Sequence, residues 1–255
     1  MTFIPAQTNL QLYRQLQSQG FGVNDIELVG HTYDLSCRML ADYFRPTQKP
    51  FTCHLVGCSS VAAKFGGSIE IVAASIAHSI YEFGQLKSAS SISADAKRSV
   101  VRACTSTSVE KLIHDYSSFN WRKFSKNSVR AWRISGEMPS EEILLMKLAD
   151  IFDDLLDGST TIAPSKKLAF GLPDDHAGRT IVMKHAKALS GEKFEHAWTQ
   201  LFVDIDTFTN PLAAPMQRKA SYRQKQDSVT DCAPAGNNDK RHQPRTNESH
   251  SPVKV

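Results

Sequence analysis

The sequence predicts an all-α protein, a helical bundle followed by a disordered C-terminal tail. Apolar residues recur at intervals of three and four, as in Ile69, Val72, Ala73, Ile76 and Ile80, and this is the spacing of one face of an α-helix. The alternation of apolar and polar residues that marks a half-buried strand is scarce. With 255 residues, of which 41% are hydrophobic, the chain is long enough to bury one sizeable core.

Helical spacing and local start and stop signals set the expected elements in order. Pro46 and Pro50 separate the second helix from the third, and the stretch FGGS at 65–68 ends the third. Ser140, which precedes two glutamates, is a plausible N-cap for the helix that carries Leu144 and Leu148. The expected helices cover roughly 8–18, 25–44, 52–65, 68–83, 95–103, 107–117, 126–133, 140–157, 176–189 and 192–205.

These helices group into a main domain with additions at both ends. We expect an N-terminal helical extension over 1–24, a main helical domain over 25–160 and a helical appendage over 161–210 that packs on the same domain. From about Gln217 the composition turns to Arg, Lys, Gln, Ser, Asn and Pro with little to bury. The segment 217–255 is therefore predicted to be a disordered basic and polar tail.

Charge and cysteine content exclude several classes of protein. The net charge is only +4 and many of the cations lie in the tail, so the folded part is near neutral and nucleic-acid binding is not indicated. The five cysteines include no CxxC pair, which argues against a zinc knuckle or a disulfide framework. Because the chain shows neither a signal-like start nor a membrane-length apolar run, we expect a cytoplasmic protein without membrane contact. The oligomeric state is left open.

The stretch VAASIAHSIYEFG, at 72–84, carries the first candidate site residues. His78 and Glu82 stand four residues apart, so a continuous helix would place both side chains on one face. His54 lies near the start of the preceding helix, and Asp150 lies in the sequence LLMKLADIFDDLLDG. Imidazole and carboxylate groups from separate helices are a common way to hold a divalent ion inside a helical bundle. A metal site is therefore chemically feasible.

The order of these motifs resembles the HD superfamily of metal-dependent phosphohydrolases. The closer similarity is to the hydrolase domain of the Rel/Spo guanosine tetraphosphate enzymes and their small stand-alone relatives. That family shows an arginine before EPYxxH, then LLHDxxED, then KLADRLHN, and here RPTQKPFTCH, IAHSIYEFG and MKLADIFDDLLD follow in the same order. The matching residues are Arg45 and His54, His78 and Glu82, and Lys147 and Asp150.

The resemblance implies an HD-like bundle that hydrolyses a phosphorylated nucleotide or another small phosphoester. It implies that His54, His78 and Asp150 hold a divalent ion, Mn or Fe. Glu82 would orient or deprotonate the attacking water, with Ser79 at the second catalytic position. The implied phosphate-binding residues are Arg45, Lys147 and Asp154, and Lys49 could join Arg45 in that role.

The chain departs from the family pattern at several positions. Ser79 stands where the family has the aspartate of its HD pair, Phe83 replaces the aspartate of the ED pair, and Asp153 and Asp154 replace HN. Two other hypotheses therefore stay open: a non-catalytic HD-like module that keeps the pocket as a binding surface, and an HD-fold iron oxygenase. An uncharacterised HD-like group of helical proteins also shows HS in this place.

The same residues also have simpler interpretations. His54 or His78 alone in an amphipathic helix would more often be a hydrogen-bonded structural histidine than a ligand. Asp153, Asp154 and Asp157 would form a solvated acidic face near a helix end, although the helix dipole disfavours acids there. Cys53 and Cys58 would be small core residues.

Overall fold

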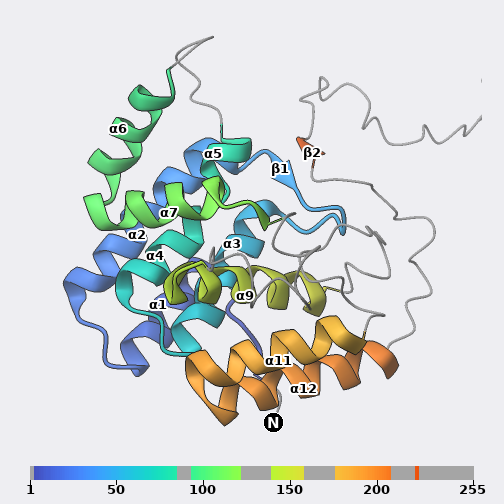
Figure 1. The fold of residues 1–255 in the computed structure, drawn as a ribbon. Coiled ribbons are helices and arrows are strands. Elements are labelled where there is room, and N and C mark those ends of the chain that lie inside the picture. The colour runs from blue at the N-terminus through green and yellow to red at the C-terminus, as the bar shows by residue number, and fades with distance from the viewer. Residues whose placement is uncertain (1–2, 85–92, 122–138, 158–175, 208–221, 224–255) are drawn as a thin grey trace, which may run out of the picture. The chain divides into compact units, whose positions relative to one another are not determined.

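The computed structural model describes residues 3–84, 93–121, 139–157, 176–207 and 222–223 (Figure 1). All of them belong to the first of two compact units, which covers Met1–Gln224. These residues are overwhelmingly helical, so the all-α prediction is confirmed. The expected helix over 126–133 lies outside the described residues, as does the expected tail over 217–255 except for Tyr222 and Arg223.

The elements follow the predicted order closely. They are α1 (Asn9–Ser18), α2 (Val23–Leu40), β1 (Tyr43–Phe44), α3 (Phe51–Lys64), α4 (Ile69–Ala77), α5 (Ile80–Phe83), α6 (Ala94–Cys104), α7 (Thr107–Ser118), α9 (Glu141–Leu156), α11 (His176–Ser190), α12 (Glu192–Thr207) and β2 (Tyr222–Arg223).

Side-chain caps explain where several of these helices begin. Thr8 forms a reciprocal capping box with Gln11 at the start of α1. The hydroxyls of Ser68, Ser93 and Ser106 accept hydrogen bonds from backbone N–H groups in the first turns of α4, α6 and α7. Ser140 does the same for α9, as the sequence predicts. Each cap satisfies a backbone donor that the helix itself leaves unpaired.

The helices α3, α4 and α9 form the centre of the fold, with α2 and α7 packed against α4 (Figure 1). Almost all of α3 is buried, and its buried serines find hydrogen-bond partners in neighbouring elements. The Ser59 hydroxyl donates to the carbonyl of Val72 over 2.8 Å. Likewise, Ser36 of α2 donates to the carbonyl of Ile76 over 2.9 Å. Such bonds let short side chains bring helices close together without burying an unpaired hydroxyl.

The helices α11 and α12 form an antiparallel pair that packs on α9 (Figure 1). Gly191 joins them with a φ of 70°, a left-handed conformation that glycine adopts without a steric penalty. Phe194 of α12 stacks on Phe65 with ring centroids 3.9 Å apart. Trp198 meets Phe152 of α9 edge to face at 5.1 Å. These aromatic contacts fix the helix pair on the side of α9 away from α7 and α5 (Figure 1).

The helix expected over 25–44 ends earlier than predicted. It stops at Leu40, and Tyr43 and Phe44 form β1, which pairs antiparallel with Tyr222 and Arg223 of β2. The proline at position 46 disfavours helical geometry at Arg45, so a helix could not continue through that residue. The same pairing places two residues of the expected tail in a short ribbon.

The helix expected over 68–83 is interrupted at positions 78 and 79. Helix α4 ends at Ala77, and α5 starts at Ile80 after a turn through His78 and Ser79. The Nδ1 atom of His78 lies 2.8 Å from the carbonyl oxygen of Ser75. In a continuous helix that carbonyl would accept from the amide of residue 79, so the imidazole takes the place of a backbone donor.

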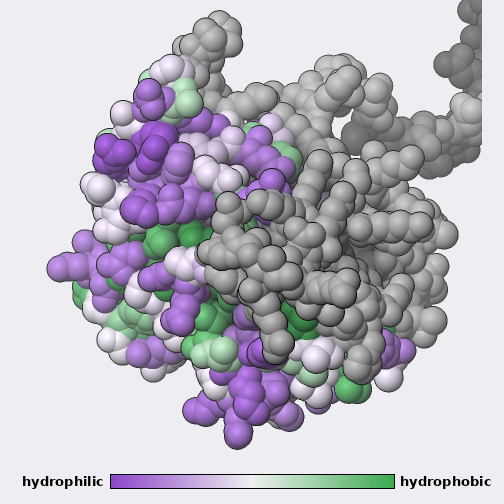
Figure 2. All heavy atoms as spheres, viewed as in Figure 1, coloured by the Kyte–Doolittle hydropathy of each residue, from purple (hydrophilic) through white to green (hydrophobic). Residues whose placement is uncertain are grey.

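Hydrophilic residues gather over α6 and α7 on the face shown in Figure 2.

Within the described ranges, no helix has both the length and the apolar character needed to cross a membrane.

Candidate metal centre

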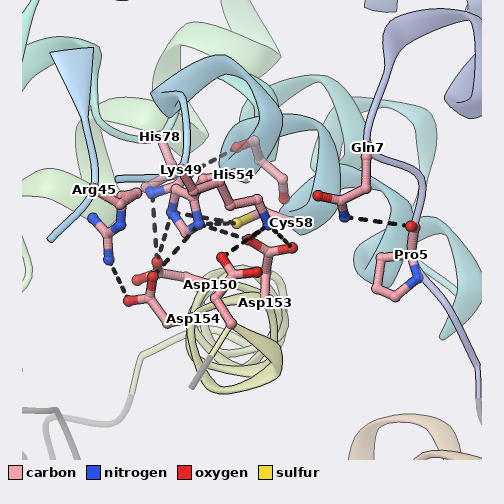
Figure 3. Close-up of polar contacts among 12 residues, drawn as sticks. Pro5, Gln7, Arg45, Lys49, His54, Cys58, His78, Asp150, Asp153 and Asp154 are labelled. Atoms are coloured by element: carbon pink, nitrogen blue, oxygen red, sulfur yellow. Dashed lines mark hydrogen bonds and ion pairs between the residues drawn. The ribbon is translucent and has the colours of Figure 1, made fainter. Parts of the chain in front are cut away.

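The candidate site lies where the start of α3 faces α9. Figure 3 shows Asp150, Asp153 and Asp154 on α9 pointing toward His54 of α3. The apolar stripe of α9, which includes Leu148 and Ile151, packs into the core, and the aspartates occupy the adjoining positions one turn apart. This packing brings the three carboxylates to a single imidazole.

His54 is fully buried and lies between two aspartates. Its Nδ1 atom is 2.9 Å from Oδ2 of Asp153, and its Nε2 atom is 3.3 Å from Oδ1 of Asp150. Burial lowers the pKa of His54, but the surrounding anions more than offset this and the pKa lies well above its ordinary value. Burial also raises the pKa of the Cys58 thiol to about 12, so that thiol is neutral. We therefore attribute the raised pKa of His54 to the carboxylates around it and not to Cys58.

His78 approaches the same carboxylate from the end of α4. Its Nε2 atom lies 3.7 Å from Oδ1 of Asp150, and its ring meets that of His54 edge to face with centroids 5.5 Å apart. Burial lowers the pKa of His78 to about 4, so the ring is neutral at neutral pH. Since Nδ1 lies against the carbonyl of Ser75, it carries the single proton and Nε2 presents a lone pair to Asp150.

The second oxygen of Asp150 is held by two donors. The Tyr116 hydroxyl donates to Oδ2 over 2.7 Å, and the Lys147 ammonium does so over the same distance of 2.7 Å. Burial raises the pKa of Asp150, but the Lys147 ammonium and then the hydrogen bond with His54 outweigh it and keep the pKa well below its ordinary value. Asp150 is therefore an anion with Oδ2 occupied and Oδ1 directed at both histidines.

Two further cations reach the cluster from the loop between β1 and α3. The amide of Arg45 donates to the carbonyl of Lys49 over 2.9 Å, which closes a tight loop. Arg45 then pairs with Asp154, and Lys49 pairs with Asp153 at 2.9 Å (Figure 3). Lys49 also pairs with Asp157 at 3.1 Å. The pKa of Lys49 is raised, because these carboxylates outweigh its burial.

The charges of this cluster balance one another. Four carboxylates face three permanent cations, and protonated His54 supplies a fourth positive charge. The carboxylates belong to Asp150, Asp153, Asp154 and Asp157, and the permanent cations belong to Arg45, Lys49 and Lys147. We refer to these residues together with His54 as the ion cluster. An uncompensated charge buried here would be strongly destabilising.

Cys58 lies one helical turn after His54 and contacts its ring. The donor atoms of His54, Cys58 and Asp150 all lie within 4.8 Å of one another. However, the Cys58 sulfur is 3.7 Å from Nδ1 and 3.6 Å from Nε2, so it sits beside the ring and not in line with either lone pair. In this rotamer Cys58 packs against the imidazole and would not share an ion bound at Nε2.

The structure brings together most of the predicted site residues. His54, His78 and Asp150 converge, and Arg45, Lys147 and Asp154 surround them. The interpretation of Asp153 and Asp154 as a solvated acidic face is wrong, because the two residues are only 0% and 7% exposed.

The expectation that Glu82 shares a face with His78 is also wrong. Ser79 is buried beside His78 in the turn, but Glu82 lies beyond the interruption of the helix and is exposed. In the described part of the chain its side chain makes no hydrogen bond or ion pair with the cluster.

Sequence reasoning missed two contributors to the site. Tyr116 lies 34 positions before Asp150, and no local pattern links two residues so far apart. Gly57 gives no signal of its own, although it lies three residues after His54 and faces Asp153 of α9. Neither as a surface acid nor as a replacement in the HN pair does Asp153 indicate a role at the site, but its position three residues after Asp150 makes the two side chains neighbours on one side of the helix.

The fold and site together describe an all-α protein with a buried cluster of two histidines and several aspartates. No protein-family model matches the chain, and none of the curated proteins is significantly similar to it.

Proposed function

We propose that the protein is a metal-dependent phosphohydrolase of the HD-like kind, acting on a phosphorylated nucleotide or another small phosphoester. One observation carries the proposal: the Nε2 atoms of His54 and His78 both face Oδ1 of Asp150, at 3.3 and 3.7 Å. For each histidine, Nδ1 lies against an acceptor, the carboxylate of Asp153 or the carbonyl of Ser75. Such outer partners are typical of histidines that bind a metal through their other nitrogen.

The donor set fits a divalent transition metal. Two imidazoles and one carboxylate are suited to Mn, Fe or Zn, whereas Mg and Ca prefer oxygen ligands alone. The lone pairs on Nε2 of His54 and of His78 and the anionic Oδ1 of Asp150 repel one another unless a positive charge lies among them. Protonation of His54 provides that charge in the metal-free protein, and an ion would replace the proton. When bound, the ion would supply Lewis acidity and lower the pKa of a water in its open position.

The cations of the ion cluster support a phosphate-bearing substrate. The side chains of Lys147 and Arg45 are 15% and 17% exposed, so both are partly accessible beside the predicted ligands. In this structure, the Lys147 ammonium compensates the negative charge of Asp150. In our proposal Lys147 and Arg45 offset charge on the substrate phosphate. Because Glu82 is exposed, we assign it no role in activating water.

A test begins with the purified protein stripped of metal by a chelator. Adding Mn, Fe or Zn should raise the melting temperature by mass action and restore hydrolysis of at least one member of a panel of phosphorylated nucleotides, including guanosine tetraphosphate. His78→Ala should lose both effects. The proposal is wrong if no metal binds, or if the metal-loaded protein neither binds nor cleaves any phosphorylated compound.

The balance of charge in the ion cluster favours one alternative, a non-catalytic helical module. Arg45, Lys49 and Lys147 are each already paired with an aspartate, as expected where buried ions serve only the fold. On this hypothesis the purified protein would contain no stoichiometric metal, and the melting temperature would not respond to added ions. Metal analysis therefore separates the two functions before any substrate is known.

A further inference from the structure

We propose that Asp153 and Gly57 determine which nitrogen of His54 binds the ion. Asp153 acts as a positioning residue through its hydrogen bond to His54, and Gly57 provides the space that this carboxylate occupies. The inference rests on the proposed metal site. It adds that the contact between α3 and α9 controls the tautomer of one metal ligand.

The carboxylate of Asp153 is fixed from two sides. One oxygen, Oδ2, lies 2.9 Å from Nδ1 of His54. The ammonium of Lys49 lies 3.1 Å from Oδ1 and 2.9 Å from Oδ2. Both His54 and Asp153 are fully buried, so water does not compete for these bonds. The next carboxylate, that of Asp154, is farther from Nδ1, at 3.6 Å.

Gly57 leaves room for that carboxylate. A Cβ atom built on Gly57 would lie 1.8 Å from Oδ1 and 2.5 Å from Cγ of Asp153, far inside any real contact. Gly57 lies within helix α3 and has an ordinary helical backbone. Glycine is therefore required here for space and not for an unusual backbone conformation. Glycine is a poor residue for a helix interior, and the approach of Asp153 explains why it stands here.

Asp153 selects between the two tautomers of the neutral His54 imidazole. A neutral imidazole has one N–H and one lone pair. Both nitrogens of His54 face a carboxylate, Nδ1 facing Asp153 and Nε2 facing Asp150 at 3.3 Å. If the proton stayed on Nε2, it would bond to Asp150 and block the lone pair that an ion needs. Asp153 holds the proton on Nδ1 and so directs Nε2 toward the ion.

Four variants test this assignment, with zinc alone as the probe. In titration calorimetry, Asp153→Ala and Asp153→Asn should each lower zinc affinity by about 10- to 100-fold, the usual effect of losing an outer-shell partner. Gly57→Ala should cause a similar loss, because the new methyl group displaces the carboxylate. In Gly57→Ala/Asp153→Ala the methyl fills the vacated space, so its affinity should equal that of Asp153→Ala.

Nitrogen-15 spectra of labelled histidine give a second readout. In zinc-loaded wild-type protein the His54 proton should reside on Nδ1 and be protected from exchange with water. In Asp153→Ala it should lose that protection. Gly30→Ala is the matched control, since its Cβ would come no closer than 3.4 Å to a neighbouring atom, the hydroxyl of Tyr13, and it should leave zinc affinity and the spectrum unchanged.

The outcomes separate the two proposals. If His54→Ala and His78→Ala still bind zinc like the wild type, the proposed metal site itself is wrong. If those variants lose zinc while Asp153→Ala keeps wild-type affinity and a protected Nδ1 proton, Asp153 has no positioning role. If the double variant binds zinc more weakly than Asp153→Ala, Gly57 acts through something other than this carboxylate. The double variant decides this point even if Gly57→Ala alone does not fold.

Discussion

The Nε2 atom of His78 lies 3.7 Å from Oδ1 of Asp150. This distance is too long for a hydrogen bond, yet it suits two ligands of one ion whose bonds are each about 2.0–2.2 Å long. The neutral state of the imidazole, with a pKa of about 4, is also the state that binds metals.

The first prediction concerns His78 and the serine that follows it. Because Ser79 is buried beside His78, Ser79→Asp should add a hard oxygen ligand and raise Mn affinity at least tenfold, or by about 1.4 kcal/mol. His78→Ala should abolish Mn binding. Titration calorimetry measures both, with the exposed Ser99→Asp as the control for added charge. Unchanged affinity in both site variants would make His78 a structural histidine.

The second prediction separates the role of Tyr116 at the site from its role in stability. Tyr116→Phe removes a 2.7 Å hydrogen bond to Asp150 and should lower the free energy of unfolding by about 1.5–3 kcal/mol, since the acceptor is charged. It should also weaken metal binding, because Asp150 loses an orienting partner. Tyr81→Phe removes a 2.8 Å bond to Glu110, outside the site, and should lower stability without changing metal affinity. Equal metal affinity in both variants would contradict an orienting role for Tyr116.

The third prediction is a pH dependence centred on Glu110, which is buried and bound by Arg98 and Arg102. Burial raises the pKa of Glu110, but hydrogen bonds led by Arg98 outweigh it and bring the pKa to about 2, below the ordinary 4.5. The stabilisation is therefore complete above pH 4.5 and is lost as the pH falls through 2. Glu110→Gln should cost about 2 kcal/mol at pH 7 and less at pH 3.

Urea denaturation of wild-type protein and Glu110→Gln at the two pH values checks this sign. The exposed Glu27→Gln serves as the control and should change the free energy of unfolding by less than about 0.5 kcal/mol at either pH. A Glu110→Gln penalty that grows as the pH falls would show that the charge of Glu110 is not what stabilises the fold.

The fourth prediction concerns the docking of α12. Phe194 is fully buried and stacks on Phe65, so Phe194→Ala should lower the free energy of unfolding by about 3–5 kcal/mol. Val203→Ala, on the same helix but 50% exposed, should change it by less than about 0.5 kcal/mol. Chemical denaturation compares the two. Similar small costs would mean that α12 is not packed as described.

Most of the fold could be predicted from local signals. The spacing of apolar residues and the caps at Thr8, Ser68 and Ser140 act within a few residues of the chain, so they set the start and extent of the helices. The break at His78 could not be read in this way, because it depends on a side chain that takes the carbonyl of Ser75. Periodicity records which residues are apolar and not how a polar side chain bonds.

The candidate site shows the same division. The sequence predicts that His54, His78 and Asp150 belong to one site, and the structure places His54 on α3, His78 in the turn after α4 and Asp150 on α9. Tertiary packing alone decided that Asp153 is buried, that Tyr116 holds Asp150, and that Glu82 lies in solvent. The physical reason is that hydrogen bonds and burial depend on distances between helices, and the contact of Gly57 with Asp153, which sets one of those distances, joins positions far apart in the chain.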